Sequence, residues 1–420
     1  MAKRILIDGF VKPGFEHVLE TFRSNLSSGL ERGGSFAAYY RGQLVVHVWG
    51  GYCDFDSRRP WKKDTLSCFF SSTKAVCAFV IAHLVDRGHL DYSERVGKYW
   101  PEFAQNGKEN ITLEQLVSLQ AGLVTLDDYK LSEIRDDPKG LEKKLAAQKP
   151  FWNPGEAFGY HPVTFALYLD QVVSHADPKH RNIAQYFKEE MANPFDIEFY
   201  IGLPKHLHYR AARVVLTRKM DLEQLAKNFK GDFNLFMETA KNPKDFHDVR
   251  RVNDPDCAEL PVGSTHGFGG ADAMAKFCGI LANGGEHEGK LLLSRELIRR
   301  FEKPIVKGYD INYGLDHWWS LGTTLFGVKE GNEPVKFIFG HGGFGGQWVG
   351  VDTHYKVGYA YTTNYCDPTA SYSGVADQRL DSLYHTVYDC IRRIENVTMP
   401  RTNYFLYSQY EKATNAKNKL

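Results

Sequence analysis

Hydrophobic stretches with the composition of β-strands lie near both ends of the chain. Residues 35–40 and 43–49 are rich in aromatic and β-branched side chains, and only Arg41 and Gly42 separate them. Two such stretches joined by two residues predict a β-hairpin with a tight turn. Further short β-rich stretches with glycine between them occur near the other end, at residues 337–339, 347–351 and 357–362.

Helical spacing dominates the middle of the chain and its last part. Residues 75–86 are apolar nearly all round, which predicts a buried helix that ends at Arg87 and Gly88. Between Leu380 and Ile394 the hydrophobic side chains repeat on one helical face, which predicts a closing helix. Further helices are predicted at residues 112–120, 162–174, 221–240, 271–283 and 294–302, the last with Ser294 as its N-cap.

Strands at both ends and helices between them predict an α/β (α+β) fold. We expect an antiparallel sheet built from both chain ends, flanked by helices, with a mainly helical lobe inserted between its two parts. The unit would span residues 1–395, with a sheet lobe at about 1–88 and 305–395 and a helical lobe at about 89–304, and residues 396–420 would form a C-terminal tail. The cleft between the lobes is the expected ligand site.

The charge balance and the apolar pattern argue against several classes of partner. Lys and Arg total 52 against 51 Asp and Glu, so a net charge of +1 gives no reason to expect nucleic acid or an anionic membrane. No run of about 18 apolar residues occurs, which predicts no membrane span. Residues 1–10 contain Asp8 and no long apolar stretch, so neither a secretory signal nor a transit peptide is expected. A small molecule is the expected partner, and the oligomeric state stays open.

The cysteines indicate a reducing compartment. The chain has seven of them, an odd number, and no two have the Cys-x-x-Cys spacing. Reduced thiols are typical of intracellular proteins, so we expect a cytoplasmic or other reducing intracellular location. Residues 418–420, Asn-Lys-Leu, loosely resemble a peroxisomal targeting tripeptide, and the peroxisome is the weaker alternative.

The first candidate for catalysis is the segment Ser71-Ser72-Thr73-Lys74. It follows an extended stretch at residues 65–70 and opens the predicted buried helix. Ser71 would then lie where helix N–H groups point outward and favour a developing oxyanion. Lys74 lies three residues further on the same helix face, where a partly desolvated amine can take the serine proton. The alternative is an N-cap serine beside a solvated lysine.

Tyr160 is the second candidate. It follows a turn at Pro154 and Gly155 and precedes the helix predicted at residues 162–174, so it lies on a connecting loop, where functional side chains concentrate. A phenolate beside an ammonium group can act as a base and then return the proton as an acid. The alternative is a packed aromatic side chain that takes no part in chemistry.

The third candidate is a glycine-rich segment at residues 340–347. Gly340, Gly342 and Gly345 formally match the pattern G-x-G-x-x-G, but a strand follows instead of a helix, so no dinucleotide is expected. Glycines at a strand indicate a close backbone approach to a ligand. His341 would project into the cleft, and a backbone N–H just after it would serve as an oxyanion donor.

Other catalytic and metal-binding patterns do not occur in the sequence. There is no Gly-x-Ser-x-Gly elbow and no His-Glu-x-x-His helix. The pair His206 and His208 lacks a third ligand at a spacing suited to zinc. No metal and no cofactor are therefore expected.

Taken together, these residues resemble the serine β-lactamase and penicillin-binding-protein superfamily. Ser71-x-x-Lys74 resembles its first motif, Tyr160 the tyrosine of its second, and residues 341–343 its third motif on the edge strand. The resemblance is closest to the class C-like branch, with the family VIII-type serine esterases and the animal β-lactamase-like proteins. It covers about residues 15–395 and keeps the order of the motifs.

The resemblance implies a fold and a set of roles. The fold would be β-lactamase/transpeptidase-like, with Ser71 as the nucleophile and Lys74 and Tyr160 as the residues that carry protons. The N–H groups of Ser71 and Phe344 would form the oxyanion hole. The substrate would lie against His341, Gly342 and Gly343.

Two departures from the family pattern bear on the substrate. His161 and Pro162 follow Tyr160 where the family has Ser or Ala and then Asn, and Gly342 stands where Thr or Ser would bind a lactam carboxylate. We therefore expect a metal-free serine acyl hydrolase that acts on carboxylic esters or small peptide-like amides. The alternatives are a true β-lactamase or D-amino-acid peptidase, and a non-catalytic scaffold that retains the fold.

Overall fold

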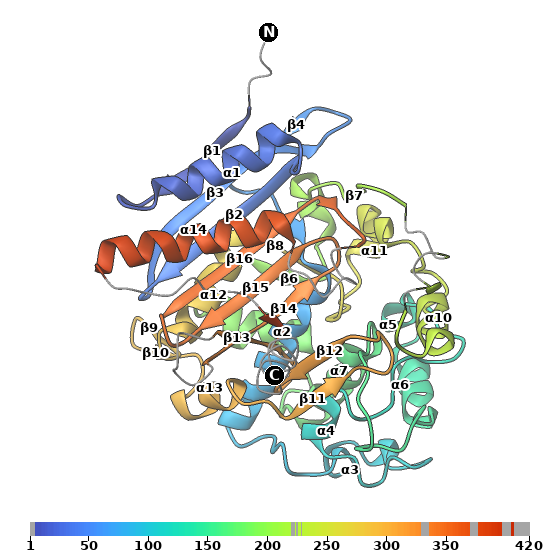
Figure 1. Cartoon of the computed structure of the whole chain (residues 1–420). Helices are drawn as coiled ribbons and strands as arrows, with labels where there is room; N and C mark the ends of the chain where they lie inside the picture. Colours follow the sequence, from blue (N-terminus) through green and yellow to red (C-terminus); the bar gives the residue numbers. More distant parts are fainter. Residues whose placement is uncertain are drawn as a thin grey trace, which may run out of the picture.

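An antiparallel sheet built from both chain ends lies at the centre of the molecule (Figure 1). The computed structural model describes residues 5–219, 223, 226–227, 229–328, 336–369, 377–396 and 405–406. The arrangement confirms the predicted fold class. In sheet order the strands are β1 (Ile7–Val11), β3 (Gln43–Asp54), β2 (Gly33–Tyr40), β16 (Val357–Thr363), β15 (Gln347–Asp352), β14 (Lys336–Gly343), β13 (Thr324–Val328), β12 (Asp316–Trp319) and β11 (Val306–Tyr309).

Helices cover both faces of this sheet and fill the space between its two parts. The four that matter most for the site are α2 (Thr73–Asp86), α7 (Thr164–Ala176), α10 (Phe233–Lys241) and α12 (Ala271–Ala282). The others are α1 (Glu16–Ser28), α3 (Val96–Tyr99), α4 (Leu113–Val117), α5 (Glu133–Asp136), α6 (Pro138–Ala147), α8 (Ile183–Tyr186), α11 (Pro255–Ala258), α13 (Arg295–Phe301) and α14 (Gln378–Glu395).

Short strands and single helical turns complete the fold. The strands are β4 (Arg59–Pro60), β5 (Ser67–Cys68), β6 (Phe199–Ile201), β7 (Val215–Leu216), β8 (Gly267–Gly269), β9 (Glu286–His287), β10 (Lys290–Leu291), β17 (Tyr365–Cys366) and β18 (Phe405–Leu406). The turns are the 3-10 segments η1 (Phe70–Ser72), η2 (Pro101–Phe103), η4 (Lys205–Arg210) and η5 (Val249–Asn253) and the π-helical segment η3 (Phe187–Ala192).

The predicted hairpin at the start of the sheet is confirmed. Strands β2 and β3 are joined by Arg41 and Gly42, whose φ angles are 51° and 77°. Two consecutive positive φ angles match the right-handed twist of the paired strands, and glycine adopts them without steric cost. β2 then pairs along its length with β16, which places the N-terminal hairpin beside the strands of the C-terminal half.

The two faces of the sheet carry different side chains. α1 and α14 lie over one face (Figure 1), where they cover large aromatic residues. α12 packs on the other face, so closely that a Cβ atom at Gly358 of β16 would lie 2.0 Å from the backbone nitrogen of Gly279. Because a strand alternates its side chains, the neighbours Tyr359 and Ala360 belong to these two opposite cores.

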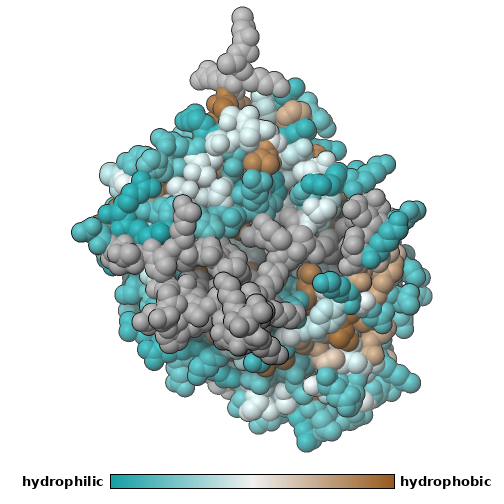
Figure 2. Space-filling view, viewed as in Figure 1, coloured by the Kyte–Doolittle hydropathy of each residue, from teal (hydrophilic) through white to brown (hydrophobic). Residues whose placement is uncertain are grey.

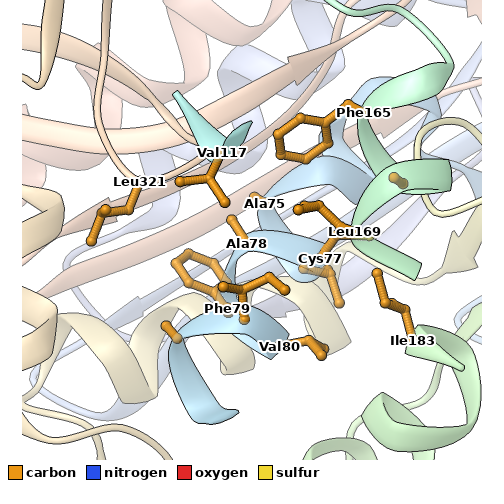
Figure 3. Packing of buried hydrophobic residues seen from close by; sticks show 14 of the residues in the cluster. Ala75, Cys77, Ala78, Phe79, Val80, Val117, Phe165, Leu169, Ile183 and Leu321 are labelled. Carbon is orange, nitrogen blue, oxygen red and sulfur yellow. The ribbon is translucent and has the colours of Figure 1, made fainter. Parts of the chain in front are cut away.

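The helix α2 is enclosed by the core, as its apolar sequence predicts. Figure 3 shows its side chains surrounded by residues of α4, α7 and α8, including Val117, Phe165, Leu169 and Ile183. Burial on all sides leaves α2 little freedom to shift or rotate. The residues at the first turn of α2 are therefore held in fixed positions.

Several predicted elements differ in extent or surroundings. The helix predicted at residues 112–120 ends early, because Leu119 has a φ angle of 66°. Of the helix predicted at residues 221–240, the structure describes α10, while residues 220–222, 224–225 and 228 lie outside the described part. α12 falls within the predicted helical lobe but packs on the sheet.

Two global features concern the surroundings of the protein. Within the described part of the chain, no helix is long and apolar enough to cross a membrane. All seven cysteines are buried free thiols.

In the predicted tail, residues 405–406 form β18, which pairs with β13.

Candidate active site

Ser71 lies in the short 3-10 turn that leads directly into α2. Its side chain is partly exposed, whereas Ser72 is buried. Phe70, the residue before it, has a φ angle of 45°, a left-handed conformation that is unusual for a bulky side chain. The core holds this strained residue in place, since Phe70 is buried and packs edge-on against Phe344 at 5.6 Å. Such strain beside an accessible serine is typical of functional sites.

Lys74 lies one turn further into α2, almost fully buried. Its Nζ donates hydrogen bonds to the carbonyl oxygens of Pro162 at 2.7 Å and Ser264 at 2.9 Å, and it lies 3.1 Å from Ser71 Oγ. Burial lowers the pKa of this amine well below its usual value. A neutral amine has two N–H groups and one lone pair. The two carbonyls take the N–H groups, which leaves the lone pair for the Ser71 hydroxyl.

Tyr160 is placed above Lys74 by the loop before α7. Lys74 Nζ lies 4.9 Å from the centre of the Tyr160 ring. The backbone of Tyr160 is held on both sides, since its N–H donates to Asp310 Oδ2 at 2.8 Å and its carbonyl accepts from Asn312 Nδ2 at 2.7 Å. Trp319 stacks on the ring at 5.8 Å. The phenol is therefore fixed in position near both Ser71 and Lys74.

The end of β14 approaches the serine turn very closely. A Cβ atom at Gly343 would lie 2.3 Å from the Phe69 carbonyl oxygen and 3.0 Å from Ser72 Oγ. Only glycine permits this approach. It brings Phe344, the next residue, to the turn that carries Ser71, as the position of the third motif predicts.

His341 of β14 is a neutral imidazole in this site. Its Nδ1 lies 2.6 Å from the carbonyl oxygen of Gly342, so Nδ1 carries the proton and Nε2 presents a lone pair. Nε2 is buried and bonds to no residue that the structure describes. Burial is the largest cause that lowers the pKa of His341, to about 3. Near neutral pH this position therefore offers no positive charge.

His161 does not take the place of the amide that its motif lacks. Its Nδ1 donates to the Gly159 carbonyl at 2.6 Å, and its Nε2 accepts from the Leu123 N–H at 2.9 Å. Burial lowers the pKa of His161 to about 4. Both ring nitrogens thus form hydrogen bonds with backbone groups, and His161 stabilises the loop that carries Tyr160.

A cavity of about 1030 Å³ opens over these residues. Of the predicted site residues it is lined by Ser71, Tyr160, His341, Gly342, Gly343 and Phe344, with Lys74 beneath them. The structure thus gathers all seven predicted positions in one place. Across the described residues, no three His, Cys, Asp or Glu side chains are grouped as a metal site.

The sequence did not point to several residues that support this site. The acceptors of Lys74 at Pro162 and Ser264 are backbone carbonyls, which any residue type can supply. Asp310 and Asn312, which hold Tyr160, lie 150 and 152 residues further along the chain. No local pattern connects such distant positions, so only the folded chain identifies them.

Comparisons with known proteins agree with this arrangement. Residues 22–383 match the family model described as Beta-lactamase. The chain is 30% identical over 370 residues to the "Esterase/beta-lactamase LipL" of Mycobacterium tuberculosis, covering 85% of this chain and 82% of that protein. It is similar to the crystal structure of a family VIII carboxylesterase, with 32% identity, a TM-score of 0.80, and 91% and 99% of the two chains covered.

A second solved structure has the same fold. It is a penicillin-binding-protein homologue from Caulobacter crescentus, with 30% identity, a TM-score of 0.76, and coverage of 91% of this chain and 99% of that one. These matches confirm both the predicted superfamily and the predicted fold class.

Proposed function

The chain belongs to the beta-lactamase family and is a serine hydrolase, and from this premise we propose that Ser71 carries the acyl group of a carboxylic ester during turnover. The observation that supports Ser71 most directly is the environment of Lys74. Two carbonyl acceptors and full burial favour a neutral amine whose lone pair faces the Ser71 hydroxyl at 3.1 Å. A serine needs such a base to become a nucleophile.

Acylation then proceeds with a balanced transfer of protons. The Ser71 hydroxyl proton passes to Lys74 Nζ while Oγ bonds to the acyl carbon. The bond from that carbon to the alcohol oxygen breaks, and Tyr160 gives the leaving alcohol its proton and takes one from Lys74. The N–H groups of Ser71 and Phe344 stabilise the negative oxygen that forms in between.

Deacylation reverses these roles. A water molecule loses a proton to the Tyr160 and Lys74 pair as it attacks the acyl carbon. The bond to Ser71 Oγ breaks, Oγ regains a proton, and a carboxylic acid leaves. The substrate is a small molecule that carries an acyl group, and the reaction needs no cofactor.

Ester substrates suit this cleft better than β-lactams do. A lactam presents a carboxylate and a side-chain amide that need partners. Gly342 has no hydroxyl for the carboxylate, the neutral His341 offers it no positive charge, and His161 is bonded to backbone groups. Each missing hydrogen bond to a charged or buried group costs about 1.5–3 kcal/mol. Two of them lower lactam turnover by roughly 10²–10⁴-fold.

We expect kcat/KM for p-nitrophenyl acetate or butyrate to exceed that for a chromogenic cephalosporin near pH 7.5. The change His341→Lys should raise the cephalosporin-to-ester ratio about 10-fold or more, because it places an ammonium group beside the lactam carboxylate. The exposed His206, which does not line the cavity, provides the matched control His206→Lys, which should leave the ratio unchanged. A wild-type cephalosporin value equal to the ester value would support the β-lactamase alternative instead.

A further inference from the structure

A row of aromatic rings leads from the site toward α10. The Tyr160 ring lies 4.9 Å from the ring of Tyr313, which lies 5.5 Å from the ring of Phe236. Trp319 stacks on the Tyr160 ring at 5.8 Å, with 21° between the ring planes. All four side chains line the cavity above Ser71. We call Tyr160, Tyr313, Phe236 and Trp319 the aromatic wall.

The backbone holds this wall in place. Asp310 Oδ1 accepts hydrogen bonds from the N–H groups of Asn312 and Tyr313 at 2.9 Å, while Oδ2 accepts from Tyr160, so one carboxylate fixes two rings of the wall. Asp232 is the N-cap of α10, and its side chain accepts hydrogen bonds from two N–H groups of the first turn. Phe236 is buried on that helix. The wall is thus formed before any substrate binds.

The side of the cavity that faces α10 extends well beyond the reacting atoms. Apolar side chains line much of it, beside the polar residues Thr239, Lys241, Asn242, His247, Asp248 and Arg250. Figure 2 shows hydrophobic side chains gathered over β12 and beside α10. A pocket that needed only to hold an acetyl or methyl group would use a small part of this volume. Besides the wall, the apolar residues that line the cavity there are Met237, Pro243, Phe246, Val249 and Leu315.

We propose that the aromatic wall binds an extended apolar group in the alcohol part of the ester. This inference rests on the proposed function, in which Tyr160 protonates the leaving alcohol. The wall begins at Tyr160, so the group attached to the leaving oxygen lies along it. The substrate class is therefore esters of long-chain or bulky hydrophobic alcohols.

Acetates of increasing alcohol length test this directly. All of them form the same acetyl-enzyme, so differences in kcat/KM report only on how the alcohol part is bound during acylation. Full burial of one methylene group raises kcat/KM about four-fold. From ethyl to hexyl acetate, which adds four methylene groups, we expect kcat/KM to rise at least ~10-fold even with partial burial. Acid release followed at constant pH measures it.

Two variants should remove the rise in kcat/KM from ethyl to hexyl acetate by different means. Phe236→Ala shortens the wall, and Ala240→Phe, at an exposed position of α10 that lines the cavity, narrows it without touching the core. Each should lower the hexyl-to-ethyl ratio at least ~5-fold, since part of the methylene burial is lost. Phe10→Ala, on the exposed face of distant β1, is the matched control and should leave the ratio unchanged.

The outcomes separate this inference from the function it rests on. A flat profile from ethyl to hexyl acetate, or an unchanged ratio in both α10 variants, overturns the role of the wall. If a fluorophosphonate probe still labels Ser71 and ethyl acetate is still hydrolysed, the failure concerns the wall alone. If Ser71 is not labelled and no acetate is hydrolysed, the proposed function itself has failed.

Discussion

Replacing Ser71 by alanine should lower kcat at least ~10³-fold, because the loss of a nucleophile removes most chemical catalysis and leaves only binding and electrostatic stabilisation. The fold should persist, since the Ser71 side chain is partly exposed and the turn around it is fixed by Phe70 and α2. Intact mass after treatment with a fluorophosphonate probe should show one adduct, and peptide mapping should place it on Ser71.

The neighbouring serine gives a matched control. Ser72 Oγ is buried and bonds to no residue within the described part of the chain, so Ser72→Ala removes one oxygen and no hydrogen bond seen there. This variant should keep both labelling and turnover. An adduct on Ser72, or labelling that survives in Ser71→Ala, would show that the nucleophile is wrongly assigned.

Loss of Lys74 or Tyr160, the two residues proposed to transfer protons, should lower activity nearly as much as loss of Ser71. Lys74→Met keeps the length of the side chain and removes the amine, and Tyr160→Phe removes only the hydroxyl. Each should lower kcat/KM ~10²–10⁴-fold, the range for a positioned acid or base. Because Lys74 Nζ, Ser71 Oγ and the Tyr160 ring lie within one small cluster, the double variant should cost little more than the worse single one.

Two further variants distinguish chemistry from burial. Lys108 is also a fully buried lysine, and it donates to three carbonyl oxygens and, among the described residues, to no serine hydroxyl. Lys108→Met should lower the melting temperature while leaving kcat/KM within a few-fold. Tyr168→Phe is the corresponding control for Tyr160→Phe. It removes a buried hydroxyl that donates to the Leu145 carbonyl, at a residue that does not line the cavity above Ser71. If the losses in kcat/KM of the two single variants multiply in the Lys74 and Tyr160 double variant, the two residues do not transfer protons as one unit.

The local elements of this protein follow from its sequence. Alternation, helical spacing and the Arg41-Gly42 turn act over a few residues, so they predict β2, α2 and α14 with nearly correct bounds and the start of β3, which runs to Asp54, five residues beyond the predicted end. The pairing of Ser71 with Lys74 is equally local, since residues three apart share a helix face. The three motifs and their order also indicate the family before any contact is known.

The tertiary structure decides the chemical state of these residues. Lys74 has a lowered pKa because α2 is enclosed and because carbonyls from Pro162 and Ser264, 88 and 190 residues away, surround its amine. His341 is neutral because burial lowers its pKa. Desolvation and hydrogen bonding depend on groups that are distant in sequence and close in space. For that reason the sequence alone predicts which residues react, and only the fold determines their protonation and forms the aromatic wall beside them.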